Sequence, residues 1–331
     1  MKISKIETLK ELIKFKIKLE NKQTEINFFQ TYDFINSYIH FYKNKFEIYI
    51  IEDASKFVIL PLSTLRYYGI MVKGFIGTPF ISEENDVIHN IKSHNTFNKF
   101  IDFFFLNIKA NFYFSNIKEG FFRDYMLKNF FMLNKFKSNT LNLDSLFNKD
   151  NLNKILINKK KEEYNLRKFK KDYNLEKIEL EDFNLSQDLI KKLNIYEFIL
   201  DNKNIKIKHY YRKMIQFLIY LTKFKLVKIN IIKAKDTILS LVISIRYKEK
   251  FYYILPCYNK KFSKYSFGNL HLQNLIKNCQ NQNISLFFLG PGQEAYKNSF
   301  ITENNFLYNF TNSKRIKLIN LMKEFTYRVI N

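Results

Sequence analysis

One segment near the C-terminal end gathers residues that suit the binding of an anion to backbone amides. Three of the seven glycines in the 331-residue chain lie in KYSFGNLHLQNLIKNCQNQNISLFFLGPGQEAYK, residues 264–297. Gly268 lies where a loop turns into an expected helix, and Ser266 and Asn269 beside it are both suitable N-cap residues. The first amides of a helix lack partners and carry the positive end of its dipole, so this loop can seat a pyrophosphate. An ordinary loop glycine is the alternative interpretation of Gly268.

The cysteines and histidines do not form a metal-binding pattern. Cys257 and Cys279 are the two cysteines and form no CxxC pair, and the five histidines include no pair with H-x-x-x-H spacing. We therefore expect no metal site, and we expect Cys257 to be a small core residue. The cysteine content is typical of a reducing cytoplasm. Because no apolar run reaches the roughly 18 residues of a membrane span, and no secretory signal is visible, we expect a cytoplasmic protein without a membrane span.

The formal net charge is +24, from 55 basic and 31 acidic residues. Such a charge is typical of proteins that bind nucleic acid or an anionic membrane, but it also follows from a codon bias toward Lys, Asn, Ile, Phe and Tyr. The lysines are scattered along the chain and no nucleic-acid-binding motif accompanies them. Codon bias is therefore the favoured explanation of the positive charge. tRNA is the one nucleic acid that we keep as an alternative partner.

Hydrophobic periodicity predicts two α+β units. In the first unit we expect a helix over residues 1–23, a hairpin around the turn EDASK, and a helix over residues 88–108. A charged helical segment over residues 148–173 connects the units. In the second unit, short turns at Lys235-Asp236 and Lys248-Glu249-Lys250 join three β-rich runs, which predicts an antiparallel meander. A helix, with Leu272, Leu275, Ile276 and Cys279 on its apolar face, and the buried strand ISLFFL follow.

Several short motifs accompany this order of elements. They are the strand FYYILPCY, the loop end Ser266-Phe267-Gly268 and the box Gly292-Gln293-Glu294-Ala295-Tyr296-Lys297, together with FFQTYDF, VILPL and GFIGTPF in the N-terminal half. Their order and spacing resemble the FemAB-like acetyltransferases of the cellulose-biosynthesis (CelD/BcsL) type, a branch of the GNAT acyl-CoA N-acyltransferase fold. The resemblance runs from about residue 27 to residue 300.

The resemblance implies an α+β fold of tandem GNAT-like domains with mixed, mostly antiparallel sheets. It implies an N-terminal GNAT-like domain over 1–147, the helical connector over 148–173, and a C-terminal acyl-CoA-binding GNAT domain over 174–331. The implied reaction is transfer of an acyl group from acetyl-CoA or another acyl-CoA, without a metal, to an amine or hydroxyl. The implied acceptor is a sugar, nucleotide-sugar or similar precursor of surface polysaccharide.

Site residues follow from the same resemblance. We expect the co-substrate to bind at Ser266, Gly268, Asn269 and Lys297. Glu294 would orient the acceptor or accept its proton, and Tyr296 would protonate the leaving thiolate or line the pocket. The alternatives are a surface ion pair between Glu294 and Lys297, and core packing for Tyr296.

The remaining candidates are expected to contact substrate or to lie apart from the site. Gln30, His209 and Tyr253 are the expected substrate-binding residues, and for His209 a role outside the site is the favoured alternative. His271 lies two residues into the helix and is expected to face solvent.

Two positions depart from the family pattern, and two other functions stay open. Phe267 replaces the proline of the family's Ser-Pro-Gly loop, and Phe288 stands where the family has an aspartate. The alternatives to an acyl-CoA-dependent enzyme are an aminoacyl-tRNA-dependent peptidyltransferase of the FemAB type and a non-catalytic binding module with a decayed site.

Overall fold

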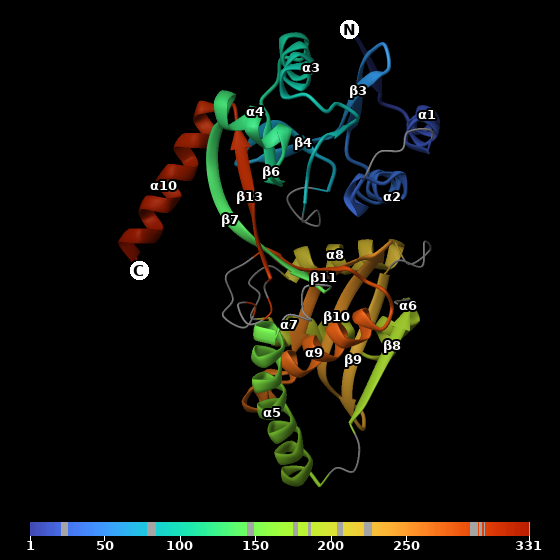
Figure 1. Cartoon of the computed structure of the whole chain (residues 1–331), viewed down its shortest axis with the longest axis vertical. Helices are drawn as coiled ribbons and strands as arrows, with labels where there is room; N and C mark the ends of the chain where they lie inside the picture. The colour runs from blue at the N-terminus through green and yellow to red at the C-terminus, as the bar shows by residue number, and fades with distance from the viewer. Residues whose placement is uncertain are drawn as a thin grey trace. The chain divides into compact units, whose positions relative to one another are not determined.

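The computed structural model describes most of the chain as two compact units (Figure 1). Unit 1 comprises Met1–Phe136 and Asn305–Asn331, and unit 2 comprises Lys137–Asn304. The division differs from the boundaries at 147 and 173 expected from the sequence, which stay a prediction about functional domains. The described residues are 1–20, 26–77, 84–143, 149–174, 178–184, 187–203, 208–221, 227–291, 297, 300 and 302–330.

Unit 1 is built on an antiparallel sheet with the strand order β1-β2-β3-β4, to which the short β5 adds by pairing with β3. The turn between β3 and β4 has left-handed backbone at Tyr68 (φ 49°) and Gly69 (φ 79°), as a tight hairpin of right-twisted strands requires. The hairpin expected at EDASK is confirmed by the pairing of β2 with β3. The strands are β1 (Lys2–Ile6), β2 (Phe46–Asp53), β3 (Lys56–Tyr67), β4 (Ile70–Phe75) and β5 (Ile88–His89).

The helices of unit 1 cover an aromatic core. Phe97, Phe100 and Phe104 of α3 are buried in one cluster with Phe114 of β6 and with Phe112, which directly precedes that strand. Strand β6 pairs with β13, so the end of the chain packs with the first unit. The remaining elements are α1 (Leu9–Glu20), the short 3-10 helix η1 (Phe28–Gln30), α2 (Tyr32–Tyr42), α3 (His94–Asn107), β6 (Tyr113–Ile117), α4 (Phe121–Asn129), β13 (Glu303–Thr311) and α10 (Lys314–Ile330).

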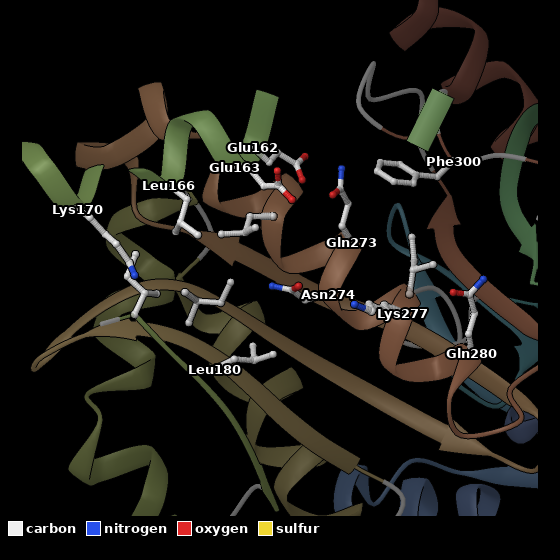
Figure 2. Close-up of a pocket in the computed structure, with 14 residues that line it drawn as sticks. Glu162, Glu163, Leu166, Lys170, Leu180, Gln273, Asn274, Lys277, Gln280 and Phe300 are labelled. Atoms are coloured by element: carbon white, nitrogen blue, oxygen red, sulfur yellow. The ribbon is translucent and has the colours of Figure 1, made fainter. Parts of the chain in front are cut away.

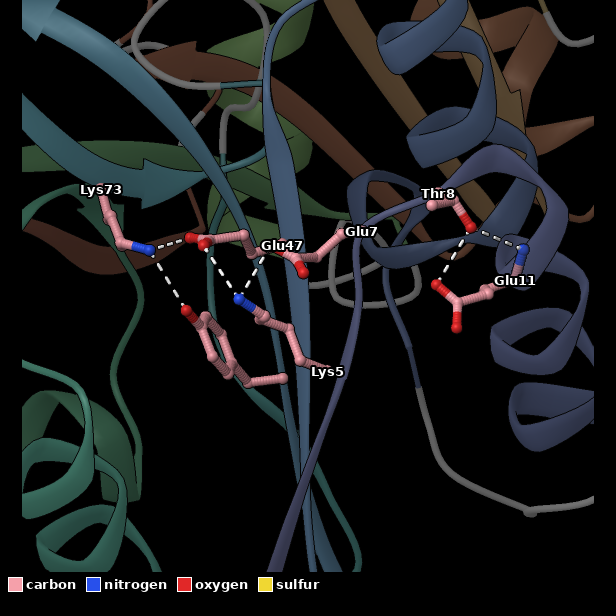
Figure 3. Close-up of polar contacts among 7 residues, drawn as sticks. Lys5, Glu7, Thr8, Glu11, Glu47 and Lys73 are labelled. Atoms are coloured by element: carbon pink, nitrogen blue, oxygen red, sulfur yellow. Dashed lines mark hydrogen bonds and ion pairs between the residues drawn. The ribbon is translucent and has the colours of Figure 1, made fainter.

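The expectation of one helix over residues 1–23 is wrong, because residues 2–6 form strand β1 and α1 begins at Leu9. Lys5 lies diagonally across from Glu47 of β2 and its Nζ lies 3.6 Å from that carboxylate, while Lys73 of β4 contacts the same carboxylate from the other side (Figure 3). Thr8 begins the helix, because its Oγ1 accepts the amide of Glu11 at 3.3 Å. Residues 2–6 therefore form a strand despite their helical periodicity, because they pair with β2 and because the helix is capped only at Thr8.

Unit 2 is a mixed sheet with the strand order β7-β12-β11-β10-β9-β8. Its one parallel pair among the described strands is β11–β12, and the meander β9-β10-β11 is confirmed, with left-handed turn residues Lys235 (φ 52°) and Lys248 (φ 54°). The strands are β7 (Phe131–Asn142), which begins in unit 1, β8 (Glu179–Asn184), β9 (Val227–Ala234), β10 (Thr237–Tyr247), β11 (Lys250–Tyr258) and β12 (Leu286–Pro291).

Helices α5 and α9 pack on the sheet of unit 2. Phe169 of α5 is buried with Ile232 of β9 and Phe267 of α9, so the C-terminal part of the charged segment expected as a connector packs on this unit. Leu272 and Leu275 of α9 pack against β11 and β12. The helices are α5 (Lys149–Asp172), α6 (Gln187–Lys192), α7 (Ile195–Asn202), α8 (Lys208–Leu221), the 3-10 helix η4 (Lys260–Tyr265) and α9 (Phe267–Gln280). None of the described helices is long and apolar enough to cross a membrane.

Gln30 ties the start of the first unit to a distant segment. Its Oε1 accepts the amide of Asn27 at 3.0 Å, the Asn27 side chain accepts the amide of Gln30 at 3.1 Å, and its Nε2 donates to the carbonyl of Asp86 at 3.0 Å. The residue is buried. Both ends of the side-chain amide are therefore engaged by backbone within unit 1.

We expect Gln30→Ala to lower the free energy of unfolding by about 1–3 kcal/mol, because it leaves a buried amide and a buried carbonyl without their partners. Urea unfolding followed by circular dichroism measures the change. Asn95→Ala, at an exposed position of α3, is the control and should change the free energy by less than about 0.5 kcal/mol. An unchanged stability in Gln30→Ala would show that the Gln30 amide is not a structural tie.

Candidate functional site

The candidate functional site in unit 2 lies where strands β11 and β12 stop pairing with each other. Their parallel ladder joins Lys250 to Leu286, Phe251 to Phe287 and Tyr252 to Phe288, and the described residues show no register pair beyond it. Strand β12 continues along β7, whereas β11 continues along β10. The ladder ends one residue before Tyr253, so the sheet opens along the second half of β11.

A β-bulge lies at the same point of β11. Its register with β10 pairs Ser244 with Tyr253 and Ile243 with Leu255, so Ile254 is the extra residue. A bulge leaves its extra residue outside the ladder and re-aims the backbone around it, and bulges are frequent beside active sites. Pro256, two residues on, has no N–H to give to a neighbouring strand, which suits a strand that has lost its partner on one side. The bulge and the proline thus both suit the end of pairing between β11 and β12 at this point.

A cavity of about 290 Å³ lies along this half of β11. It brings together Tyr253, Gly268 and Asn269, three residues that the sequence analysis selected. Lys203, which ends α7, and Ser240 of β10 complete the polar part of its wall. Pro256, Cys257 and Tyr258 are its other lining residues.

The start of α9 forms one end of the cavity. Ser266 adopts a left-handed conformation (φ 57°), and its carbonyl accepts the amides of Asn269 at 3.0 Å and Leu270 at 3.1 Å. The amides of Phe267 and Gly268 precede these first intrahelical bonds, so they lie at the positive end of the helix dipole. The unusual backbone is therefore at Ser266, and Gly268 has no left-handed φ. A Cβ at Gly268 would lie 3.4 Å from the Tyr258 ring, so a larger side chain would enter the cavity end.

Positive charge lies beside this helix start. Lys203 lines the cavity, and both Lys203 and Lys260 lie close enough to lower the pKa of Cys257, although burial dominates and raises that pKa to about 11. The Lys260 amide donates to Asn202 Oδ1 at 2.7 Å, which holds the end of α7 against the loop before α9. The Cys257 thiol is protonated at neutral pH, which fits the core role expected for it. The cationic rim and the helix amides together suit a phosphate-bearing ligand.

His271 was expected to face solvent, and this expectation is wrong because the residue is fully buried. Its Nδ1 lies 2.9 Å from Ser240 Oγ, and Ser240 Oγ donates to the carbonyl of Cys257 at 3.3 Å. Helix α9 packs on β10 and β11, so its buried face is wider than the stripe of leucines suggested. Burial lowers the pKa of His271 to about 3, so the ring is neutral at physiological pH. Its polar contact is with Ser240, which lines the cavity.

The other predicted site residues lie elsewhere or outside the described residues. Glu294 and Tyr296 lie outside the described residues, and the side chain of His209 in α8 is likewise not described. Lys297 is buried, and its Nζ donates to the carbonyl of Gly290 at 3.5 Å. Gln30 belongs to unit 1. Lys297 is not among the residues that line the cavity.

Sequence reasoning missed Lys203 and Ser240. Lys203 has no distinguishing signal in a chain this rich in lysine. Ser240 carries a weak signal, because it is a polar residue in the otherwise apolar strand TILSLVISI. Among the described residues, no group of three or more His, Cys, Asp or Glu could hold a metal ion.

Part of this unit is similar to a known domain family. Residues 206–298, which include the meander, α9 and the lining residues of the cavity other than Lys203, match the family model described as an acetyltransferase (GNAT) domain. A comparison with curated protein sequences finds no match. This part of the second half of the chain is thus similar to a GNAT acetyltransferase domain.

Solved structures share the fold of the whole chain. The C-terminal domain of an Agrobacterium fabrum protein described as a lysylphosphatidylglycerol synthetase superposes with a TM-score of 0.58 at 10% identity, covering 95% of both chains. FemX gives 0.58 at 8% identity, covering 96% of this chain and 100% of its own. L-PGS from Bacillus licheniformis gives 0.53 at 12% identity, covering 96% of both chains. The expected fold class, α+β with tandem GNAT-like units and mixed, mostly antiparallel sheets, is confirmed.

The buried His271 predicts a pH dependence of stability. Because its folded pKa lies below the usual 6.5, the unfolded chain binds the proton more tightly between about pH 3 and 6.5, and stability is lost as pH falls through this window. We expect the loss to be about 1.4 kcal/mol per pH unit below 6.5, relative to His271→Asn, which keeps an amide for Ser240 but does not titrate.

Urea unfolding of both proteins at pH 7.0, 6.0 and 5.0 measures the difference. His40→Asn, at an exposed histidine of α2, is the control and should follow the wild-type curve. Parallel curves for the wild type and His271→Asn would contradict a buried neutral histidine.

Proposed function

We propose that the protein is an acyltransferase that binds acyl-CoA in the cavity along β11 and transfers the acyl group to an amine or hydroxyl. One observation carries the proposal. The sheet opens at the Ile254 bulge, and the cavity along the opened strand is also lined by Lys203 and by Gly268 and Asn269 at the start of α9. A long ligand with an uncharged arm and a charged pyrophosphate fits an opened sheet that ends at a cationic helix start. The match of residues 206–298 to an acetyltransferase domain supports the same assignment.

In this proposal the phosphates lie on the amides of Phe267 and Gly268, with Lys203 as counter-charge. The thioester lies along β11, where an amide at the bulge around Ile254 polarises its carbonyl as negative charge develops on the oxygen. The acceptor nitrogen or oxygen attacks the carbonyl carbon, the carbon–sulfur bond breaks, and the CoA thiolate leaves. The acceptor loses one proton and the thiolate gains one. Glu294 as the base and Tyr296 as the acid stay our proposals for these two transfers.

In this proposal Tyr253 forms part of the wall beside the reacting carbonyl, and Ser240, which also lines the cavity, contacts the thioester arm. Lys297 faces the carbonyl of Gly290, so its proposed role is to hold the end of β12 and the segment that carries Glu294. Gln30 is engaged by backbone within unit 1, so we propose no substrate contact for it. The sugar or nucleotide-sugar acceptor is proposed from the motifs that resemble the CelD/BcsL branch, and His209 keeps its proposed contact with that acceptor.

Calorimetric titration of acetyl-CoA into the purified chain tests the co-substrate. We expect a dissociation constant in the micromolar range, and at least a tenfold loss in Gly268→Trp, because the indole would fill the end of the cavity next to Tyr258. Asn278→Trp places the same side chain on the exposed part of the same helix and should bind like the wild type.

The absence of binding to acetyl-CoA and to longer acyl-CoAs would overturn the proposal. If tRNA then bound with an affinity that falls steeply with salt, the aminoacyl-tRNA-dependent transferase would replace it. Binding of neither would favour the non-catalytic module.

Lys203→Gln tests the counter-charge separately. We expect the variant to bind acetyl-CoA about 3- to 10-fold more weakly at low salt, and we expect the difference to shrink as ionic strength rises. Acetyl-pantetheine lacks the charged nucleotide, so both proteins should bind it equally. An equal loss of affinity for the two ligands would place Lys203 on the uncharged arm and contradict the assigned position of the phosphates.

A further inference from the structure

A second and larger cavity of unit 2 has no part in the proposed reaction. Its volume is about 490 Å³, within the range of small-molecule sites. Helix α5 forms one wall, α9 forms the other, and the β8–β9 edge of the sheet forms the floor (Figure 2). None of its lining residues lines the cavity along β11. The apolar part of its lining includes Leu166, Ile178, Leu180, Ile232, Ile276 and Phe300.

Two buried polar atoms face each other across this cavity. Glu162 of α5 is only 4% exposed, and its Oε2 has no hydrogen-bond partner among the described residues. Gln273 Nε2 of α9 is also buried and also lacks a partner among them. Figure 2 shows the two side chains pointing toward one another from the two helices. Burying such groups without a partner costs stability, so this arrangement points to a ligand that completes it.

The charges around Glu162 limit what that ligand can be. Burial raises the pKa of Glu162 to about 8, and Lys161 offsets only part of this effect, so the carboxyl group is protonated at neutral pH. Glu163 and Lys170 on α5 and Lys277 on α9 are the other charged groups at the cavity. A protonated carboxyl both donates and accepts, whereas Gln273 Nε2 donates.

Simple charged head groups match this cavity poorly. An ammonium only donates, so it would leave Gln273 Nε2 without an acceptor. A carboxylate could accept from the protonated Glu162 and from Gln273 Nε2, but it would meet the like charge of Glu163, which lines the same cavity. A carboxamide accepts from Gln273 through its carbonyl and donates to Glu162 through its N–H, so it satisfies both atoms without requiring a charge on Glu162.

We propose that this cavity binds a neutral amphiphilic molecule whose carboxamide lies between Glu162 and Gln273 and whose apolar body lies on Leu180 and Ile232. Helix α9 is the one element that lines both this cavity and the proposed acyl-CoA site. Its Leu270 lines this cavity, and its Asn269 lines the acyl-CoA site. Its ligand is therefore a second molecule and not the acyl donor.

Isoleucine methyl NMR of the full chain tests this site directly, because Ile178, Ile232 and Ile276 report from its wall. Hexanamide is the probe, and hexylammonium and hexanoate have the same chain length with charged head groups. We expect hexanamide at millimolar concentration to shift the three methyl signals in a saturable way at pH 7. The two charged analogues should bind at least tenfold more weakly. No shift with hexanamide, or an equal or stronger response to a charged analogue, would overturn the proposal.

Variants separate hydrogen bonding from charge. Glu162→Leu and Gln273→Leu should each weaken hexanamide binding at least tenfold, whereas Glu162→Gln, which still donates and accepts, should stay within threefold of the wild type. Glu163→Gln is the matched control one residue along α5 and should also stay within threefold. Thermal melting confirms that each variant is folded. Tight binding to Glu162→Leu, or loss in Glu162→Gln, would contradict the carboxamide assignment.

The outcome is independent of the proposed acyl transfer. Gly268→Trp blocks the other cavity and should leave hexanamide binding unchanged. Glu162→Leu should leave acetyl-CoA binding unchanged. Loss of hexanamide binding in Gly268→Trp would mean that the probe occupies the cavity along β11, which would overturn the proposal.

Discussion

The parting of β11 from β12 is the constraint on which the second unit depends. A strand can leave its neighbour only if its remaining backbone groups find another use, since buried amides and carbonyls without partners are costly. The ladder to β10 satisfies one side of β11, the bulge at Ile254 redirects the backbone, and Pro256 removes an N–H that would otherwise need a partner. Strand β12 is meanwhile held by β7 on its other side. Each of the two strands therefore keeps one hydrogen-bonded neighbour where the sheet opens.

The first turn of helix α9 lines one end of the cavity that this opening leaves along β11. Its apolar residues fasten it to β11 and β12, and this packing places its first turn at the end of the opened strand. Ser266 turns the chain sharply into the helix through a left-handed conformation, and a polar residue tolerates this conformation at modest cost. His271 is the polar exception on the buried face, and Ser240 satisfies one of its ring nitrogens. The middle of the same helix forms a wall of the second cavity, so one element lines both cavities.

The first unit is held by different means. Its core is aromatic, with phenylalanine rings of α3, α4 and β6 in edge and stacked contacts. Gln30 and Asn27 fix the entry to α2 by hydrogen bonds to backbone at residues 84 and 86. A short motif such as FFQ can thus be a structural signature, because it joins a reciprocal helix cap to a distant loop. A polar residue inside such a motif, such as Gln30, therefore does not by itself indicate contact with a substrate.

Local pattern and turn chemistry in the sequence determined the fold class, the hairpins at residues 235 and 248, and the start of α9 after the loop that contains Ser266. Each of these depends on neighbours in the chain, such as a turn residue, a short apolar run or a cap. The cavity along β11 was only half predictable, because Tyr253, Gly268 and Asn269 lie near the motif whereas Lys203 and Ser240 reach it from other elements. Tertiary structure alone decided that residues 2–6 pair as a strand, that His271 is buried, and that Glu162 faces Gln273. These outcomes depend on which surfaces pack together. When a segment that is distant in the sequence covers a residue, the local hydrophobic periodicity around that residue does not reveal its burial.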